Sequence, residues 1–545
     1  MFKRHIHLIS TWNYIRNLEW CINATKFSLL MSCCNVIIYN FPVILFTANN
    51  LDYLSLNGVL IIATVVIVIF IVTSLFLLVL CILSFNLAKL FCLLVALCNS
   101  IALYFVITYR VVLDTTMMSN VFNTNLTEAS SYWHYKMILY LIILGVIPSI
   151  FIYKFRINKV KRINLFLQSF VLIVVLISWT YLNANKLLWI DKYSSRLGAR
   201  IMPWSYIGNT IRLQQLKHKY SSNQELLPPA QLEESNEKTI IILVIGEAAR
   251  AENFSLYGYN RPTNPLLKKQ GVIALNNTVS CATYTTLSLR CILSHKDVST
   301  PFSKQYEPLP SYLQRHGVDV VWRTNNWGEP PMKVNTYQRS DELERECKGD
   351  QCQYDEVLLS GLGERVRSSM QQNIFIVIHR WGSHGPSYYK RYSKQYEIFK
   401  PVCKSVELNQ CTNHELVNAY DNSILYTDYF LTQTINLLQD LKTPAVMIYI
   451  SDHGESLGEF GLYLHGVPYA VAPDVQTHIP FIVWMSPEFI EKKGIDINRI
   501  KQSKSHSHQN IFHSVLGAIN MHSEVYNDQL DIFNTMIDNL GESDP

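Results

Sequence analysis

Five apolar runs in the first third of the chain constrain its fold more strongly than any other feature. The run "VLIIATVVIVIFIVTSLFLLVLCIL", residues 59–83, contains no charge and is long enough to cross the hydrocarbon core of a bilayer. The first run is interrupted by Asn35, Asn40 and Pro42. The sequence predicts five membrane-spanning helices, near residues 27–48, 57–82, 87–109, 136–153 and 164–182.

The positive charges of the connecting segments predict the orientation of these helices. The N-terminal segment carries four basic residues, and the fourth loop, "YKFRINKVKR", carries five. The first loop, "TANNLDYLSLN", carries none. Because Lys and Arg accumulate on the cytoplasmic side, the N-terminus and the fourth loop are expected there. With five spans, everything after about residue 183 lies outside the cytoplasm.

The twelve cysteines separate into two groups that agree with this topology. Six lie in or near the apolar runs and are expected to act as small apolar residues. The other six form three local pairs: Cys281/Cys291, Cys347/Cys352 and Cys403/Cys411. The alternative, a zinc ribbon, requires C-x-x-C knuckles that the sequence lacks. Three disulfides in an oxidising compartment are therefore predicted.

Three domains follow from the change in pattern along the chain. Residues 1–183 form the membrane domain and residues 184–238 a bridge. Within the bridge, "RIMPWSYIGNTIRLQQLKHKY" predicts a helix, either at the bilayer interface or as an ordinary amphipathic helix of the outer domain. From residue 239 to 545, short apolar runs alternate with helix-like stretches, as in a parallel α/β sheet. The predicted core strands cover residues 239–245, 318–322, 373–378, 445–450 and 479–484.

Metal-capable side chains follow three of these strands. Glu247 follows the first, "HRWGSHGP" with His379 and His384 follows the third, and "SDHGE" with Asp452 and His453 follows the fourth. Ligands bind beyond the carboxyl ends of strands in open α/β sheets, so these side chains are expected to converge.

Carboxylate and imidazole groups suit a zinc or manganese centre. For Asp452 and His453 alone, a helix cap and a packing histidine are the simpler interpretation. Together with Glu247, His384 and His465, the metal site is favoured, with Gly454 allowing the chain to turn. Two further acids nearby are expected at a helix start or on the surface: Glu455 and Glu459.

A hydroxyl nucleophile is expected between Cys281 and Cys291. The segment "SCATYTTLSLRC" contains four hydroxyl side chains: Thr283, Thr285, Thr286 and Ser288. Such a group needs activation by a metal or base, and a helix N-terminus would hold a phosphate beside it. Physical reasoning alone does not choose among the four, and a stapled Thr-rich turn is the structural alternative.

The ordered motifs of the outer domain resemble one family along essentially the whole chain. They are "VIGEAARAENFSLYGYNRPTNP", "SCATYTTLSLRC", "HRWGSHGPSYYKRY", "NAYDNSILYTDYF" and "SDHGESLGEFGLYLHGVPYAVAP". They are similar to the phosphoethanolamine transferases of Gram-negative bacteria, which include lipid A-modifying and mobile colistin-resistance enzymes. The resemblance implies a five-helix transmembrane bundle followed by an α/β alkaline phosphatase/sulfatase-like periplasmic domain, anchored in the bacterial inner membrane.

Site roles carry over from this resemblance position by position. It implies that Thr285 is the nucleophile, and that it binds the catalytic Zn²⁺ together with Glu247, Asp452 and His453. It implies that His384 and His465 contact the transferred phosphate or a second zinc ion during turnover. Residues expected to hold the ethanolamine donor, on one face of a helix, are Asn120, Thr124 and Glu128.

The implied reaction moves phosphoethanolamine from phosphatidylethanolamine to lipid A or to the Kdo sugar of the lipopolysaccharide core. It proceeds through a phosphoethanolamine-threonine intermediate, in an enzyme expected to be a monomer. The resemblance also implies a lower negative surface charge and resistance to polymyxins. The net charge of +5 is too small to indicate a nucleic-acid partner.

Two departures and three alternative functions accompany this interpretation. Trp327 and Pro330 stand where lipid A enzymes often carry Ser and Lys, and Lys333 is the nearby replacement. "LSLRC" resembles the members that modify Kdo. The alternatives are a phosphoglycerol transferase of the same superfamily, an inactive envelope protein, and a sulfatase. The sulfatase is disfavoured because its C-x-P-x-R pattern is missing around Cys281.

Overall fold

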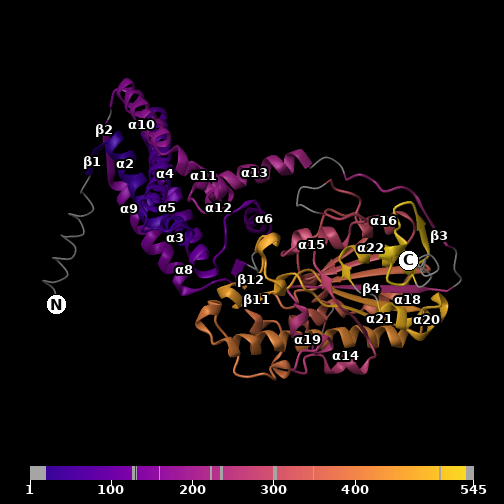
Figure 1. Cartoon of the computed structure of the whole chain (residues 1–545). Helices are drawn as coiled ribbons and strands as arrows, with labels where there is room; N and C mark the ends of the chain where they lie inside the picture. Colours follow the sequence, from indigo (N-terminus) through magenta and orange to yellow (C-terminus); the bar gives the residue numbers. More distant parts are fainter. Residues whose placement is uncertain are drawn as a thin grey trace, which may run out of the picture. The chain divides into compact units, whose positions relative to one another are not determined.

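In the computed structural model, the chain divides into two compact units (Figure 1). The first contains Met1–Phe122 and Trp133–Gln215, and the second contains Asn123–Tyr132 and Leu216–Pro545. The structure describes residues 20–124, 129–130, 132–158, 160–220, 224–233, 237–298, 304–345, 347, 349–502 and 505–534. The boundary between Gln215 and Leu216 falls within residues 184–238, the predicted bridge, whereas Asn123–Tyr132 belongs to the second unit although it lies within residues 1–183, the predicted membrane domain.

Within the described residues, four helices of the first unit are long and apolar enough to cross a membrane. They are α4 (Leu56–Leu83), α5 (Phe85–Tyr109), the continuous helix α8–η2–α9 (Tyr135–Lys154) and α10 (Arg162–Leu182). A fifth span exists only if a bent pair is counted as one: α2–η1 (Ala24–Tyr39) meets α3 (Phe41–Asn49) at 56°. A membrane region is therefore shown, with four spans or five.

The bend lies where polar residues interrupt the first apolar run. Asn40 donates from Nδ2 to the carbonyl oxygen of Met202 at 2.8 Å and accepts the Met202 N–H at 2.9 Å. Asn35 donates to the same carbonyl oxygen at 3.1 Å. These amides satisfy a distant backbone segment, which explains why two polar side chains lie buried in an apolar helix.

The helix predicted in the bridge is present as α13 (Trp204–Tyr220). At its first residue, Trp204 Nε1 donates to Thr73 Oγ1 at 3.2 Å, and the indole packs edge-on against Phe76 at 5.0 Å. The start of α13 therefore packs on α4.

All five predicted strands are present in one seven-stranded sheet of the second unit. The order is β5 (Ile273–Leu275), β13 (Phe481–Met485), β10 (Ala445–Ser451), β4 (Thr239–Gly246), β9 (Asn373–His379), β7 (Asp319–Thr324) and β8 (Thr336–Arg339). The prediction of a parallel sheet is wrong for β13, which runs antiparallel to both neighbours. For β13 to run parallel to β10, the chain would have to return, in a crossover connection, to the end of the sheet at which β10 begins. The chain between β10 and β13 instead forms only short elements before entering β13.

The central strands are hydrophobic on both faces because helices cover both faces. Every residue of β4, β9 and β10 is buried. Figure 1 shows α19 (Asn413–Leu441) and α22 (Gln509–Ala518) on opposite sides of the sheet. Ile241, Leu243 and Ile245 of β4 belong to the same apolar cluster as Phe512 of α22. The sheet is therefore a rigid platform whose strand ends can carry a site.

The cysteines follow the predicted division. The three predicted disulfides are all formed: Cys281–Cys291, Cys347–Cys352 and Cys403–Cys411. The six cysteines in or near the apolar helices are free. The first of these disulfides brackets the hydroxyl-rich segment.

Candidate active site

Glu247, Asp452 and His453 meet at the ends of two neighbouring strands. Gly246 of β4 pairs with Ser451 of β10, so the next residues along each strand emerge side by side. His453 Nε2 lies 3.1 Å from Glu247 Oε1 and 3.2 Å from Asp452 Oδ2. All three side chains are fully buried. The predicted convergence of these three residues is present.

The hydrogen bonds of this cluster leave its lone pairs facing one another. His453 Nδ1 lies 2.9 Å from the Gly454 carbonyl oxygen, so Nδ1 carries the proton and Nε2 faces the carboxylates. Neither His453 Nε2 nor Asp452 Oδ2 has a hydrogen-bond partner among the described residues. Burial disfavours the imidazolium, yet the adjacent Asp452 and Glu247 carboxylates raise the pKa of His453 to about 10, so Nε2 takes up a proton wherever no other cation occupies the cluster. The cluster thus demands a positive charge, and these donors fit a zinc ion.

Among the four candidate hydroxyls, the geometry favours Thr285. Its Oγ1 lies 3.2 and 3.4 Å from the two oxygens of Glu247. Thr283 and Ser288 instead donate to backbone carbonyl oxygens, and Thr286 Oγ1 is buried with no described partner. Thr285 is also the first residue of α15 (Thr285–Ile292). The free N–H groups of this helix end favour a phosphate beside the hydroxyl.

His384 and His465 lie next to Glu247, and the ring centroids of His465 and His453 are 4.2 Å apart. One ring nitrogen of His384, one ring nitrogen of His465 and one carboxylate oxygen of Glu247 all lie within 4.8 Å of one another. Their Nδ1 atoms face the Gly385 carbonyl oxygen at 2.6 Å and Glu455 Oε2 at 2.7 Å. Burial lowers the pKa of His384 to about 3, so its imidazole is neutral at physiological pH. Both rings are therefore held in a defined orientation next to the metal-capable cluster.

Two residues of this site were missed by the sequence analysis. Asn326, just beyond the end of β7, donates from Nδ2 to Glu247 Oε2 at 2.7 Å and to a backbone carbonyl oxygen at 3.2 Å. Glu455 was expected at a helix start or on the surface, and this expectation is wrong. It is fully buried and accepts hydrogen bonds from Tyr388 OH at 2.5 Å and from His465. The position of Asn326 beyond a strand end was an available signal; for Glu455 there was none.

The backbone beside Glu247 is strained and firmly held. Ala248 has a φ of 53°, which is unusual for a residue with a Cβ atom. Its N–H donates to Asp452 Oδ1 at 3.1 Å, and its carbonyl oxygen accepts from Tyr420 OH at 2.7 Å. These bonds fix the direction in which Glu247 leaves the strand.

Gly454 serves a different purpose from the predicted one. Its φ is not in the left-handed region, so the chain does not depend on it for an unusual turn. A Cβ atom at this position would lie 2.0 Å from the carbonyl oxygen of Val475. Glycine is required here by the close approach of another backbone segment.

His379 reaches the predicted strand end but points to a different partner. It is fully buried, and its Nδ1 lies 3.4 Å from Thr324 Oγ1 of β7. None of the metal-capable groups found among the described residues includes it.

The predicted donor-binding face is not carried by one continuous helix. Asn120 lies in α6 (Thr115–Asn123), and the helix ends before Thr124. Glu128 lies outside the described residues.

Trp327 and Pro330, which stand where lipid A enzymes often carry Ser and Lys, lie in a loop beyond Asn326. Trp327 N–H donates to Asn326 Oδ1 at 3.0 Å, and Pro330 lines a small cavity together with Arg290 and Lys304. The Lys333 side chain is exposed, and its backbone N–H donates to Ser311 Oγ at 2.7 Å.

The chain is similar to known proteins over most of its length. A family model described as Sulfatase matches residues 239–521, and one described as Phosphoethanolamine transferase EptA/EptB matches residues 69–219. Phosphoethanolamine transferase EptA of Helicobacter pylori is 38% identical over 521 residues, covering 94% of this chain and 96% of that protein. Phosphoethanolamine transferase EptA of Escherichia coli K12 is 34% identical over 461 residues, covering 80% and 83%.

A solved structure extends the likeness to both units of the chain. It is the integral membrane protein lipooligosaccharide phosphoethanolamine transferase A (EptA) from Neisseria meningitidis, at 27% identity with a TM-score of 0.86. The match covers 94% of this chain and 99% of that chain.

Proposed function

The chain belongs to the phosphoethanolamine transferase family, and on this premise we propose that it transfers phosphoethanolamine from phosphatidylethanolamine to lipid A or Kdo. One observation carries the proposal. The Thr285 hydroxyl contacts Glu247 inside a buried cluster that demands a cation, at the start of a helix. Such an arrangement suits a nucleophile that attacks an anionic phosphoryl group.

The residues of the cluster fit a zinc site. Glu247, Thr285, Asp452 and His453 would hold one firmly bound Zn²⁺, and His384 and His465 would hold the phosphate or a second ion during turnover. When bound, zinc lowers the pKa of a ligating hydroxyl and offsets charge on a phosphoryl oxygen. The unpartnered lone pairs of Asp452 and His453 support this assignment.

The chain's own residues account for the two transfer steps. Thr285 Oγ1 donates its proton towards Glu247, bonds to phosphorus and displaces diacylglycerol, whose oxygen takes up a proton from solvent. The product is phosphoethanolamine-threonine. A phosphate or hydroxyl oxygen of the acceptor then bonds to phosphorus, and any proton on that oxygen passes to solvent. The bond to Thr285 breaks, and Thr285 Oγ1 takes back the proton from Glu247. The first residues of α15 hold the phosphoryl oxygens throughout.

We place this reaction at the outer face of the bacterial inner membrane. Residues 1–183 would span it, residues 184–238 would bridge, and residues 239–545 would form the periplasmic catalytic domain of a monomer. The apolar helices and three disulfides support this placement. Asn120, Thr124 and Glu128 would contact the ethanolamine donor. The added ammonium group lowers negative surface charge, which weakens the binding of polymyxins and cationic peptides.

Mass spectrometry of lipopolysaccharide tests the proposal. Cells with the wild-type protein should gain species heavier by about 123 Da, the mass of a transferred phosphoethanolamine. Thr285→Ala should abolish these species. Ser288→Ala, on the same helix as Thr285, should retain them, because the Ser288 hydroxyl donates to the Ala282 carbonyl oxygen rather than to Glu247. Fragments would assign the group to lipid A or Kdo. Identical spectra for wild-type and Thr285→Ala cells would refute the proposal, and a gain of about 154 Da would indicate phosphoglycerol transfer instead.

A further inference from the structure

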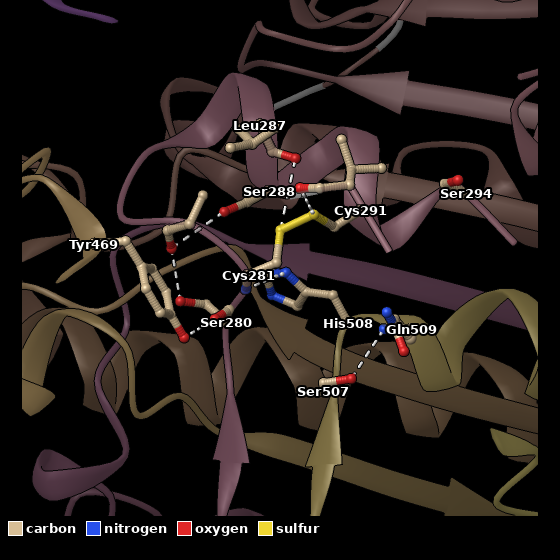
Figure 2. Close-up of a disulfide and its surroundings, with 12 residues drawn as sticks. Ser280, Cys281, Leu287, Ser288, Cys291, Ser294, Tyr469, Ser507, His508 and Gln509 are labelled. Atoms are coloured by element: carbon tan, nitrogen blue, oxygen red, sulfur yellow. Dashed lines mark hydrogen bonds between the residues drawn. A yellow bond between two sulfur atoms is a disulfide. The ribbon is translucent and has the colours of Figure 1, made fainter. Parts of the chain in front are cut away.

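His508 joins the two segments that carry Thr285 and Asp452. It directly precedes α22 and follows β14 (His506–Ser507), which pairs in parallel with β6 (Thr278–Val279). This pairing brings His508 alongside the residues that follow β6, at the start of the disulfide-bonded loop. Figure 2 shows the His508 imidazole beside Cys281. The side chain is fully buried and takes no part in the proposed transfer steps.

Both nitrogens of the His508 ring are engaged, each by a different segment. The Cys281 N–H donates to Nδ1 at 3.3 Å, so Nδ1 is an acceptor. Nε2 therefore carries the proton, and it lies 3.0 Å from the carbonyl oxygen of Ser451. Burial lowers the pKa of His508 to about 4, which agrees with this neutral form. One imidazole thus bridges a residue four positions before Thr285 and the residue directly before Asp452.

Ser451 extends this bridge to the remaining ligand segment. Its Oγ donates to the His453 carbonyl oxygen at 3.0 Å and accepts the Ala249 N–H at 2.9 Å. Ala249 lies two residues after Glu247 on the chain leaving β4. The bonds from His508 and Ser451 therefore reach all three segments that bring ligands to the proposed metal centre.

The Cys281–Cys291 disulfide cannot supply this connection. It joins the loop to α15 over a sequence separation of 10, so it fixes the shape of the Thr285 segment. Among the described residues, its sulfur atoms contact the carbonyl oxygens of Leu287 and Val298 and make no hydrogen bond to β4 or β10. Placing Thr285 against Glu247 requires contacts between the loop and the sheet, and the Cys281–His508–Ser451 chain is such a contact.

We propose that His508 is a positioning residue of the phosphoryl-transfer site, which holds the Thr285 loop in register with the Glu247, Asp452 and His453 ligands. The proposal rests on the proposed function for its consequence in turnover. Residues that orient metal ligands through hydrogen bonds typically affect metal affinity or activity by about 10- to 100-fold. A loss of that size is expected when both bonds of His508 are removed.

The test compares His508→Leu with His513→Leu in the full-length protein. His513 is a matched control, because it is also buried and belongs to α22. Its ring also engages two backbone groups, accepting the Asn527 N–H at 3.1 Å and facing the His295 carbonyl oxygen at 3.2 Å. Both substitutions remove one imidazole and two hydrogen bonds, but only one of them touches the ligand segments.

Two readouts are measured: Zn²⁺ affinity by competition with a chromogenic chelator, and diacylglycerol release from phosphatidylethanolamine. His508→Leu should lose about 10- to 100-fold in both, while His513→Leu stays within about threefold of wild type. Equal behaviour of the two variants would overturn the proposal. If the wild type binds zinc but releases no diacylglycerol, the proposed function fails while the affinity comparison still decides the role of His508.

Two milder variants keep the test decisive if His508→Leu does not fold. The amide of His508→Asn can replace Nδ1, and that of His508→Gln can replace Nε2, so each retains one of the two bonds. Each should fall between wild type and a full loss in zinc affinity. If both match their counterparts His513→Asn and His513→Gln, the proposal is wrong.

Discussion

Replacing Glu455 by Gln should slow phosphoethanolamine transfer strongly, although it exchanges a single oxygen for an amide group. Glu455 is fully buried and directly precedes β11 (Ser456–Leu457), which forms a hairpin with β12 (Tyr463–Leu464), and His465 directly follows β12. It accepts hydrogen bonds from Tyr388 OH at 2.5 Å and from His465 Nδ1 at 2.7 Å. The second bond places the histidine proton on Nδ1 and leaves Nε2 as the atom available to a phosphate or metal.

The magnitude follows from the bonds that the amide cannot reproduce. If the amide NH₂ faces His465, the proton must move to Nε2, and that atom loses its lone pair. If the amide oxygen faces His465, the tautomer survives, but a neutral hydrogen bond replaces a charge-assisted one. Hydrogen bonds to charged groups contribute about 1.5–3 kcal/mol and neutral ones about 0.5–1.5 kcal/mol, so the loss ranges from about 1 kcal/mol, where a neutral bond remains, to about 3 kcal/mol, where none does. At about 1.4 kcal/mol per tenfold in rate, transfer should fall roughly 5- to 150-fold.

The assay measures diacylglycerol release by the purified full-length protein, with thermal unfolding as the control for folding. Glu459→Gln is the matched variant, because Glu459 belongs to the same hairpin but pairs with Arg250 at 2.6 Å on the partly exposed side. It should change the rate by less than about threefold, since the Gln amide retains an oxygen that can accept from the buried Arg250 guanidinium, and Glu459 makes no hydrogen bond to His465 among the described residues. A Glu455→Gln rate within threefold of wild type, or equal losses in both variants, would refute the role assigned to Glu455.

Three further perturbations have expected outcomes. Gly454→Ala forces a Cβ atom to within 2.0 Å of the Val475 carbonyl oxygen and should destabilise the fold by about 1–3 kcal/mol or more in denaturant unfolding. Gly363→Ala, which meets only a distant side-chain end, should not. Removing zinc with a chelator should lower the thermal unfolding midpoint of the wild type. If free zinc had been at 100 times its Kd, the loss corresponds to about 2.7 kcal/mol of stability. The midpoint of Asp452→Asn should change much less. Burial raises the pKa of Asp531 to about 6, so between about pH 4 and 6 the folded chain retains a proton that the unfolded chain loses. The free energy of unfolding should therefore fall by about 3 kcal/mol as the pH rises through this range. Asp531→Asn should remove this pH dependence.

The sheet could be predicted because its strands are buried on both faces and therefore appear as continuous apolar runs. The runs at 239–245, 373–378 and 445–450 correspond to fully buried strands. The direction of β13 was not contained in its own residues, which suit either direction equally well. The missing crossover between β10 and β13 was the available signal, because a parallel strand needs one.

The metal-capable cluster could be predicted because its residues directly follow strands. Strand pairing brings Glu247 and Asp452 together whatever the loops do, since Gly246 pairs with Ser451. Glu455 and His508 could not be found in this way. Their roles depend on contacts between loops and on local strand pairs of two residues each, which leave no periodic pattern in the sequence.

Three histidines of the site are each followed by glycine, yet they are oriented by two different means. His384 and His453 direct Nδ1 to the carbonyl oxygen of that glycine, at 2.6 and 2.9 Å, so each ring is fixed by its own backbone. His465 instead directs Nδ1 to the Glu455 side chain, which directly precedes β11 on the other arm of the hairpin. Its orientation therefore depends on a carboxylate that a mutation can remove, whereas a backbone carbonyl cannot be removed. For this reason the Glu455 substitution alters the orientation of His465 and leaves that of the other two histidines unchanged. Its effect should appear in the step that requires the His465 Nε2 lone pair. The affinity of the Glu247, Asp452 and His453 cluster for zinc should not change.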